Sequence, residues 1–407
     1  MTLNPTSINP GLPVDRAWLR ERVVELSSIH RPSASEGERR AAELIAADLD
    51  SAGARVRIEV EQAHGHYWVP LALLSGAGAL AGLLGRRHRL AGATLGAAVS
   101  AALWDDLTGG ELHFRKLLPK RPTYNVVAEV GPADAQRTVV LVSHHDAARS
   151  GLIFHPGIPE FVWRRFPQLI ESQDTSPAVM WPVFAGPALA ALGSAAGSTT
   201  LRRLGTVLSV GSVFTFAEIG SRGVVPGAND NITGAVTLMA LARALAERPA
   251  ENLRVMLVST GSEESFMEGM KAFAKRHFPS LPQRDTFVLC VDTVGSPHLT
   301  APRGEGMLKM FDYPREGLDL VDTVAAELDI FLFPNLRLRN ATDGLHALRA
   351  GYPSAFLGSV TEYKAPANYH WPSDTPENVN YDTMADAVRL CEGIVRRLDK
   401  RWLQQDL

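Results

Sequence analysis

A run of apolar residues that ends in ionisable side chains lies near the middle of this sequence. Residues 139–142 are Val-Val-Leu-Val, and Ser-His-His-Asp follows at 143–146. A short β-branched run between turn residues is typical of a fully buried strand. Because strand side chains alternate between faces, we expect His144 and Asp146 on one face and His145 on the other. A histidine beside a carboxylate at a strand end is typical of a metal ligand oriented by an acid, although a solvated pair has the same pattern.

Strand and helix patterns alternate on both sides of this segment. The apolar positions of residues 14–28 fit one helical face, and Ser35 with Glu38 forms a capping box before a helix that continues to about Gly53. Further apolar runs predict strands at 54–60, 123–130, 253–260, 287–291 and 354–357 and helices at 235–247 and 381–403. This alternation predicts an α/β fold with a mixed, mainly parallel central sheet that is flanked by helices.

Two pairs of uncharged, Leu/Ala/Gly-rich segments interrupt the pattern. The first pair is Trp68–Gly85 and Leu90–Trp104, separated by Arg86-Arg-His-Arg89. The second pair is Thr175–Leu201 and Leu204–Ala217, separated by Arg202-Arg203. Each pair predicts a helical hairpin with a basic tip, so we expect insertions at 68–104 and 175–219. The second insertion leaves the chain between Asp146 and Asp230, and we expect it to border the functional cleft.

These insertions predict association with a membrane. A membrane span needs about 20 apolar residues, a length that Thr175–Leu201 exceeds and Trp68–Gly85 approaches. The runs have almost no polar face, although buried core helices of a soluble cap have the same composition. By the positive-inside rule, the basic tips favour an orientation with the tips in the cytoplasm. The Arg-rich segment before Trp68 favours the opposite orientation. The sequence therefore does not decide on which side of the membrane the catalytic domain lies. A soluble cytoplasmic protein is the alternative.

Composition narrows the class of protein. A chain of 407 residues has room for two or three domains, or for one large α/β domain with insertions, here 14–67, 105–174 and 220–407. The net charge of −3 provides no basic field for nucleic acid. Cys290 and Cys391 stand in apolar contexts and are expected to be buried thiols. The proline-rich residues 1–13 lack the pattern of a signal peptide and are expected to form a disordered tail.

More acids and histidines follow the other predicted strands. Asp230 lies in the polar loop 226–234, Glu263 and Glu264 follow one strand, Asp292 follows another, and His370 lies near the C-terminus. Because the carboxyl ends of the strands line the crevice of an open α/β sheet, we expect these groups to converge with those of the central strand. A donor set of His, Asp and Glu without Cys is typical of a hydrolytic zinc, cobalt or manganese site.

The order of these motifs resembles the M28 family of zinc exopeptidases, which includes bacterial aminopeptidases. The segment Thr342–Pro353 is also similar to a Ser-Asp-His-x-x-Phe segment of that family, except that Gly344 stands where the family usually has His. No substrate contact is therefore carried over from this position, and substrate-binding residues stay unknown. The resemblance covers about residues 14–60, 123–151 and 226–403, and it implies a zinc exopeptidase fold that acts on the N-terminal peptide bond of peptides.

The resemblance also implies a role for each residue of the set. His144 and Asp292 would hold one zinc ion, Glu264 and His370 a second, and Asp230 would bridge the two, with Co²⁺ or Mn²⁺ as possible substitutes. Glu263 would be the general base, and Asp146 would bind the second nitrogen of His144. A single-zinc glutaminyl cyclase, a catalytically silent membrane scaffold and a carboxypeptidase direction stay open as alternatives.

Overall fold

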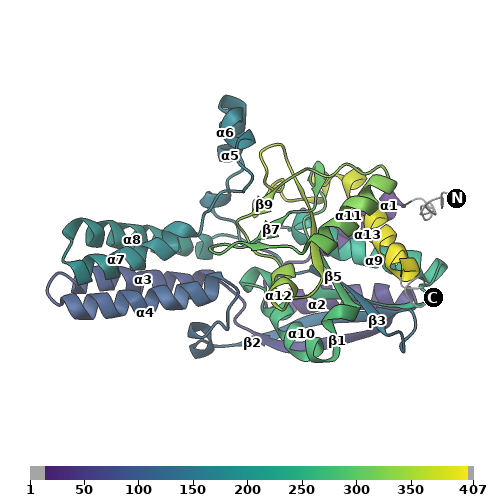
Figure 1. The fold of residues 1–407 in the computed structure, drawn as a ribbon, viewed down its shortest axis with the longest axis horizontal. Helices are drawn as coiled ribbons and strands as arrows, with labels where there is room; N and C mark the ends of the chain where they lie inside the picture. The colour runs from purple at the N-terminus through teal and green to yellow at the C-terminus, as the bar shows by residue number, and fades with distance from the viewer. Residues whose placement is uncertain (1–13, 402–407) are drawn as a thin grey trace.

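The computed structural model describes residues 14–401 and comprises an α/β domain from which a helical bundle projects (Figure 1). The expected tail at 1–13 and the expected helix end at Leu403 lie outside the described residues. The predicted α/β class with a mixed sheet flanked by helices is confirmed.

The main sheet of the described chain has seven strands in the order β1-β2-β4-β3-β5-β10-β6. Strands β4, β3, β5 and β10 run parallel to their neighbours in this series, whereas β1, β2 and β6 are attached antiparallel. A separate three-stranded sheet has the order β8-β7-β9. The strands are β1 Arg55–Ala63, β2 Arg121–Val130, β3 Arg137–His144, β4 Leu253–Thr260, β5 Thr286–Val291, β6 His298–Thr300, β7 Gly304–Glu305, β8 Phe311–Asp312, β9 Arg337–Leu338 and β10 Ser354–Val360.

Helices cover both faces of the main sheet. Core residues of α1, α2, α9, α11 and α13 pack on one face, and those of α10 and α12 pack on the other. The helices of this domain are α1 Arg16–Ser27, α2 Glu36–Ser51, α9 Thr233–Glu247, α10 Glu268–His277, α11 Arg315–Glu327, α12 Gly344–Arg349 and α13 Tyr381–Arg401.

Strand β3 lies at the centre of the sheet because both of its faces are apolar. Val139 and Leu141 belong to the core under α9 and α13, and Val140 and Val142 belong to the core under α10 and α12. All four side chains are fully buried. Burial on both faces explains why this strand is a continuous apolar run, and it delivers His144 to the carboxyl edge of the sheet.

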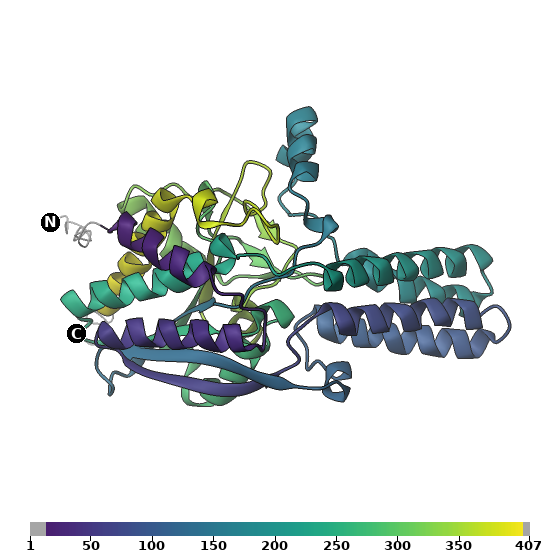
Figure 2. The same cartoon turned by 180° about the vertical axis from the view of Figure 1, so that it is seen from behind.

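The inserted segments form a four-helix bundle that extends away from the sheet (Figures 1 and 2). Its helices are α3 Trp68–Leu84, α4 Arg89–Leu107, α7 Trp181–Ala196 and α8 Thr199–Ser221. Helix α3 packs on α4 and α8, and α7 packs on the same two helices. The ends near the sheet, which include Trp68 and Trp181, are called the bundle root below, and the opposite ends are called the tip.

The second hairpin turns at a different place from the one predicted. Gly197 has a left-handed backbone (φ 70°) that ends α7, and the Ser198 side chain accepts the Leu201 N–H at the start of α8. Glycine after a helix and serine before one are strong end signals. The turn is therefore at Gly197 and Ser198 and not at the arginines as predicted, but Arg202 and Arg203 lie among the first residues of α8 and so are still at the tip.

A third projecting segment was not predicted. Helices α5 Gly157–Arg165 and α6 Pro167–Glu171 form a short arm that stands at the boundary between the bundle and the α/β domain (Figure 1). The arm runs across the long axis of the bundle in both views (Figures 1 and 2).

Candidate metal centre and cleft

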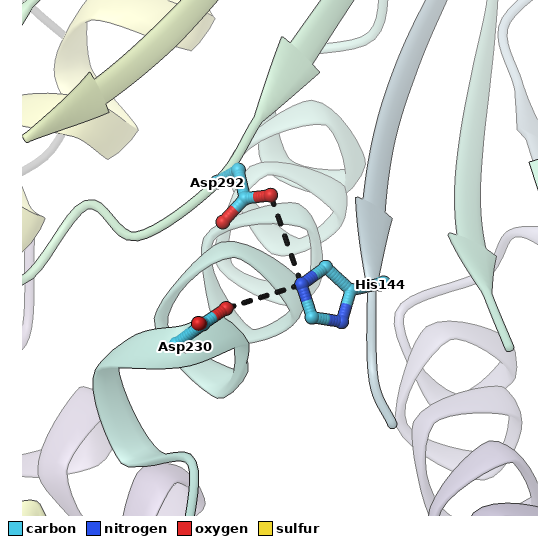
Figure 3. A group of neighbouring side chains, drawn as sticks. All are labelled: His144, Asp230 and Asp292. Atoms are coloured by element: carbon cyan, nitrogen blue, oxygen red, sulfur yellow. Dashed lines mark ion pairs between the residues drawn. The ribbon is translucent and has the colours of Figure 1, made fainter. Parts of the chain in front are cut away.

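The carboxyl edge of the sheet brings all the predicted site residues together. His144 ends β3, Asp292 follows β5, and Glu263 and Glu264 follow β4 in a short 3-10 turn. Asp230 lies in the turn Ala228–Ile232 that leads into α9, and His370 lies in the loop after β10. Figure 3 shows Asp230 and Asp292 pointing at the same ring nitrogen of His144.

Two groups of possible metal ligands share Asp230. His144 Nε2 lies 3.3 Å from Asp230 Oδ1 and 3.7 Å from Asp292 Oδ2. His370 Nε2 lies 3.1 Å from Asp230 Oδ2 and 3.2 Å from Glu264 Oε1. Within each group the ligand atoms lie within 4.8 Å of one another. Each oxygen of Asp230 therefore faces a different histidine.

Glu263 lies beside the first group. Its Oε2 is 4.0 Å from His144 Nε2, and its side chain lines the cleft. Glu264 faces His370 instead, so the two neighbouring glutamates lie beside different histidines.

Asp146 connects the histidine to the glutamate loop. Its Oδ1 lies 3.3 Å from His144 Nδ1 and accepts the Glu263 N–H at 3.0 Å, while its Oδ2 accepts the Glu264 N–H at 3.1 Å and the Ser33 hydroxyl at 2.6 Å. One fully buried carboxylate therefore sets the positions of three residues of the site.

Asp374 binds the backbone at Asp230, as Asp146 binds the backbone of the two glutamates. Its two oxygens accept the backbone N–H groups of Asn229 (2.7 Å) and Asp230 (3.1 Å). Burial raises the pKa of Asp374 to about 7, and the neighbouring Asp230 adds to the shift. Asp374 follows His370 by four residues, but nothing in the sequence pattern indicates that it binds the backbone of Asp230.

The loop that carries the glutamates is held in an unusual conformation. Ser262, Phe266 and Met267 all have positive φ, at 52°, 71° and 56°. Such residues keep this backbone only when their surroundings fix it. The fully buried Glu38 accepts the Ser262 N–H at 3.1 Å, and the Arg115 guanidinium donates to the Ser265 carbonyl at 2.8 Å.

The centre concentrates negative charge away from water. Burial raises the pKa of Glu263 and of Asp292 well above their usual values, and the nearby carboxylates of Glu264 and Asp343 add to both shifts. Burial opposes protonation of His370, but Glu264 and Asp230 raise its pKa to about 10. Five buried or nearly buried carboxyl groups thus meet only two histidines: Asp146, Asp230, Glu263, Glu264 and Asp292.

This donor set fits divalent cations. Asp230 Oδ2 and Glu264 Oε1 are buried, and both face the same nitrogen, His370 Nε2, at 3.1 and 3.2 Å, without a well-aligned hydrogen bond to any described residue. Two buried carboxylate oxygens that share one imidazole leave negative charge that a cation or proton must compensate. Imidazole and carboxylate ligands suit zinc, and carboxylates also suit manganese. His144, Asp230 and Asp292 could hold one ion, and Asp230, Glu264 and His370 a second.

An apolar cleft opens directly above these ligands. Its volume is about 240 Å³, and its floor includes Asp230, Glu263, Glu264, Asp292 and His370. The walls come from the bundle root, from both ends of the α5–α6 arm and from the loop that follows Glu264, through Tyr67, Phe154, Pro159, Met180 and Phe266. The second insertion therefore contributes to the cleft wall at Met180.

Two further supporting residues, Arg31 and Glu268, could not be predicted from the sequence because their partners are distant along the chain. Arg31 is fully buried and donates to the carbonyls of His145 (2.8 Å), Pro226 (2.5 Å) and Gly227 (2.6 Å). Glu268 binds the His64 ring and accepts the His64 N–H at 2.8 Å. The sequence around these two positions shows no pattern that indicates such contacts.

The comparison with known proteins agrees with the fold and the motifs. Residues 212–395 match the model of the family described as Peptidase family M28, and no curated protein matches the sequence. The resemblance to M28 zinc exopeptidases is confirmed, and the match supports a metal-dependent exopeptidase.

Three solved structures share the fold. A Zn-dependent exopeptidase from Parabacteroides distasonis is 12% identical, with a TM-score of 0.55 over 94% of this chain and 98% of that one. An aminopeptidase from Aneurinibacillus is 14% identical, with a TM-score of 0.53 over 95% and 94% of the two chains. A glutaminyl cyclase from Tannerella forsythia is also 14% identical, with a TM-score of 0.56 over 94% and 98%.

Proposed function

We propose that this chain, whose residues 212–395 carry the M28 match, is a metal-dependent aminopeptidase with a dinuclear zinc centre. One observation carries the proposal: the two oxygens of Asp230 face two different histidines, each of which has a further carboxylate beside it. A bridging carboxylate between two sets of ligands is the arrangement that a two-metal hydrolase needs.

The residues around the centre would divide the work of hydrolysis. Bound zinc ions would lower the pKa of water and polarise the scissile carbonyl. Glu263 belongs to neither of the two ligand groups that share Asp230, and it lines the cleft. We assign it the role of general base, which accepts a proton from water and returns it to the leaving amine. Asp146 holds the ring of His144 and the backbone of both glutamates for this purpose.

The size of the cleft favours an exopeptidase. A volume of about 240 Å³ is below the usual range of pockets that enclose a drug-sized ligand, about 300–1,000 Å³. A small cleft suits a short terminal segment of a peptide better than the middle of a long chain. The carboxylates at the cleft floor would also give it a negative potential that attracts the ammonium group of a peptide N-terminus.

Glutaminyl cyclisation is the second candidate, because a glutaminyl cyclase shares this fold with similar coverage. The described residues offer three ligand groups, His144 with Glu263 and Glu264 and the two that share Asp230, and the sharing of Asp230 favours the dinuclear peptidase. A catalytically silent scaffold would not need the complete set of seven site residues, which are His144, Asp146, Asp230, Glu263, Glu264, Asp292 and His370.

The test is elemental analysis of the wild type, Asp230→Ala and Asp382→Ala, combined with hydrolysis of aminoacyl amides and cyclisation of a glutaminyl peptide. Asp382 is an exposed residue of α13 and serves as the matched control. We expect two ions per wild-type chain, with both ions and hydrolysis lost only in Asp230→Ala. One ion with cyclisation would establish the cyclase, and no ion with neither activity would establish the scaffold.

We also propose that the bundle is inserted in a membrane. Toward the tip its interior is lined by small residues and its surface by large apolar ones, the reverse of a soluble bundle, whereas the interior at the root holds large side chains such as Leu71, Leu103 and Phe216. A Cβ at Gly186 would lie 2.9 Å from the Ser209 nitrogen, and one at Gly205 would lie 2.4 Å from the Ala190 nitrogen. The exposed side includes Leu83, Leu90, Leu192, Val207 and Phe214.

The lengths of the helices fit this proposal only in part. Helix α8, with 23 residues, is long and apolar enough to cross a membrane, and α3 and α7 are apolar but shorter. The expectation that Thr175–Leu201 would form the long span is therefore wrong, since α7 covers only Trp181–Ala196. At 1.5 Å per residue, shorter helices can span only if the bilayer thins or flanking residues reach to its surface.

Fractionation tests this part of the proposal. The full-length chain should sediment with membranes, resist extraction by high salt and alkaline carbonate, and be released by detergent. Complete recovery in the soluble fraction without detergent would show that the bundle is a soluble cap.

A further inference from the structure

The α5–α6 arm carries large apolar side chains that no other part of the described chain covers. Ile158, Phe161 and Leu169 are 60%, 63% and 56% exposed, and Phe166 is 46% exposed. Helices α5 and α6 contact each other and make few contacts with other helices or strands. An apolar surface of this kind on a projecting helix pair indicates an external partner.

The position of the arm indicates which partner this is. The arm stands at the level of the bundle root and runs across the bundle axis (Figures 1 and 2). The same level carries Trp104 and Trp181, which are 42% and 41% exposed and both lie near Phe184. Exposed tryptophans at the end of an apolar bundle are typical of the boundary between bilayer and water. A helix pair that runs across the bundle axis at this level would lie along the bilayer surface.

Both ends of the arm are fixed at the rim of the cleft. At the first end, the Phe154 ring lies 4.7 Å from the ring of His370, and the His155 ring lies 4.6 Å from that of Trp371. At the second end, Lys364 Nζ donates to the Ile170 carbonyl at 2.7 Å. Phe154, His155 and Lys364 also line the cleft. The arm is thus built into the mouth of the cleft rather than attached elsewhere on the domain.

We propose that the α5–α6 arm lies in the headgroup layer of a phospholipid bilayer and that the cleft beside it takes peptides held at the bilayer surface by an apolar segment. This inference rests on the proposed peptidase function and on the membrane insertion of the bundle. Exposed Val179 lies in the segment that connects the end of the arm to Trp181 at the root. The arm carries two arginines and two glutamates and has no excess of charge, so its attachment is apolar and does not require anionic lipid.

The position of the arm can be measured with nitroxide labels on the full-length protein in phosphatidylcholine nanodiscs. Phe161→Cys and Leu169→Cys are suitable sites, because the native Cys290 and Cys391 are buried. Glu247→Cys, an exposed position at the end of α9, is the control. We expect high collision rates with oxygen and low rates with a water-soluble nickel complex at 161 and 169, and the reverse at 247.

The substrate class can be measured with two forms of one leucyl peptide, a plain amide and a hexadecyl amide that partitions into the nanodisc. Wild type should cleave the anchored form several-fold faster at equal total concentration. Phe161→Glu combined with Leu169→Glu should remove this preference and leave the rate on the plain amide unchanged. Gln168→Glu, an exposed polar position of α6, should behave as wild type.

Each outcome decides the proposal. Labels at 161 and 169 that resemble the control would show that the arm lies in water and would overturn it. Dipolar broadening between labels, with low accessibility to both reagents, would show that a second copy covers the arm and would also overturn it. If wild type cleaved neither peptide, the peptidase function would fail and with it the substrate class, while the label data would still decide the position of the arm.

Discussion

The ring of Tyr67 stacks on the ring of Phe266, with centroids 5.4 Å apart and planes 8° from parallel. Tyr67 is the N-cap residue of α3 in the bundle, and Phe266 follows Glu264 by two residues in the glutamate loop. The Arg115 guanidinium lies 4.6 Å from the same Phe266 ring. The bundle root is therefore in direct contact with the loop that positions the proposed base and a proposed metal ligand.

Loss of this stack should impair turnover more than folding. In Tyr67→Leu the support of Phe266 is lost, and a misplacement of about 1 Å at a reacting group can reduce kcat up to about 100-fold. Tyr67→Phe keeps the ring and should retain most of the activity. Steady-state kinetics with elemental analysis would measure this effect, and metal content should be unchanged in both variants.

A second buried tyrosine provides the control for Tyr67. Tyr352 is 2% exposed, lies 4.5 Å from the Phe278 ring and has no contact with the centre. Tyr352→Leu should lower the midpoint of thermal unfolding without a fall in kcat. If Tyr352→Leu reduced kcat as much as Tyr67→Leu, the stack at the bundle root would have only a structural role.

Asp374→Asn should weaken metal binding. An amide has one acceptor oxygen, so its NH₂ group would face one of the two N–H groups of Asn229 and Asp230 that the carboxylate now accepts. Changes behind a metal ligand typically reduce affinity about 10–100-fold. Titration with a competing chelator would measure the change, with Asp382→Asn as the exposed control. Equal affinities in Asp374→Asn and wild type would contradict the role assigned to Asp374.

Glu263→Gln and Glu264→Gln should fail in different ways. Glu263→Gln should keep both ions and lose about 10²–10⁴-fold in kcat, because an amide cannot accept the proton from water. Glu264→Gln should lose the ion beside His370, since Glu264 Oε1 lies 3.2 Å from His370 Nε2. Metal analysis and single-turnover hydrolysis separate the two cases. Wild-type turnover by Glu263→Gln would exclude it as the base.

The sequence was sufficient to predict six strands of the main sheet and to place the site residues at one edge, whereas the short strands β6 to β9 were not predicted. Residues 139–142 indicate a buried strand because both faces of β3 meet apolar side chains, and ligands placed after parallel strands must meet at one edge. The contacts of Asp374 and Arg31 could not be predicted in this way, because their partners are backbone groups from distant loops. A backbone partner leaves no trace in the pattern of side chains.

The second hairpin shows a different limit. The two arginines predict a turn at 202–203, whereas the chain turns at Gly197 and Ser198, because a left-handed glycine and a serine cap are stronger local signals than charge. The arm α5–α6 was missed because short helices without a buried face have no apolar periodicity to detect.

Two glycines of α8 provide a matched test of the bundle packing. A Cβ at Gly205 would lie 2.4 Å from the Ala190 nitrogen and 2.5 Å from the Gly186 oxygen, whereas a Cβ at Gly211 would meet nothing within 4 Å. Gly205→Ala should force α7 and α8 apart and cost about 1–3 kcal/mol, the usual range for overpacking. Gly211→Ala should be neutral or stabilise the helix by up to about 1 kcal/mol, because alanine has the higher helix propensity.

Thermal unfolding of both variants in the same detergent would measure this difference. The midpoint should fall for Gly205→Ala and should stay equal or rise for Gly211→Ala. Because the bundle root contacts the glutamate loop through Tyr67, Gly205→Ala should also reduce kcat, to a smaller extent than Tyr67→Leu does. Equal midpoints for the two variants would show that α7 and α8 do not pack through Gly205, and the close-packed bundle that supports the membrane proposal would then be wrong.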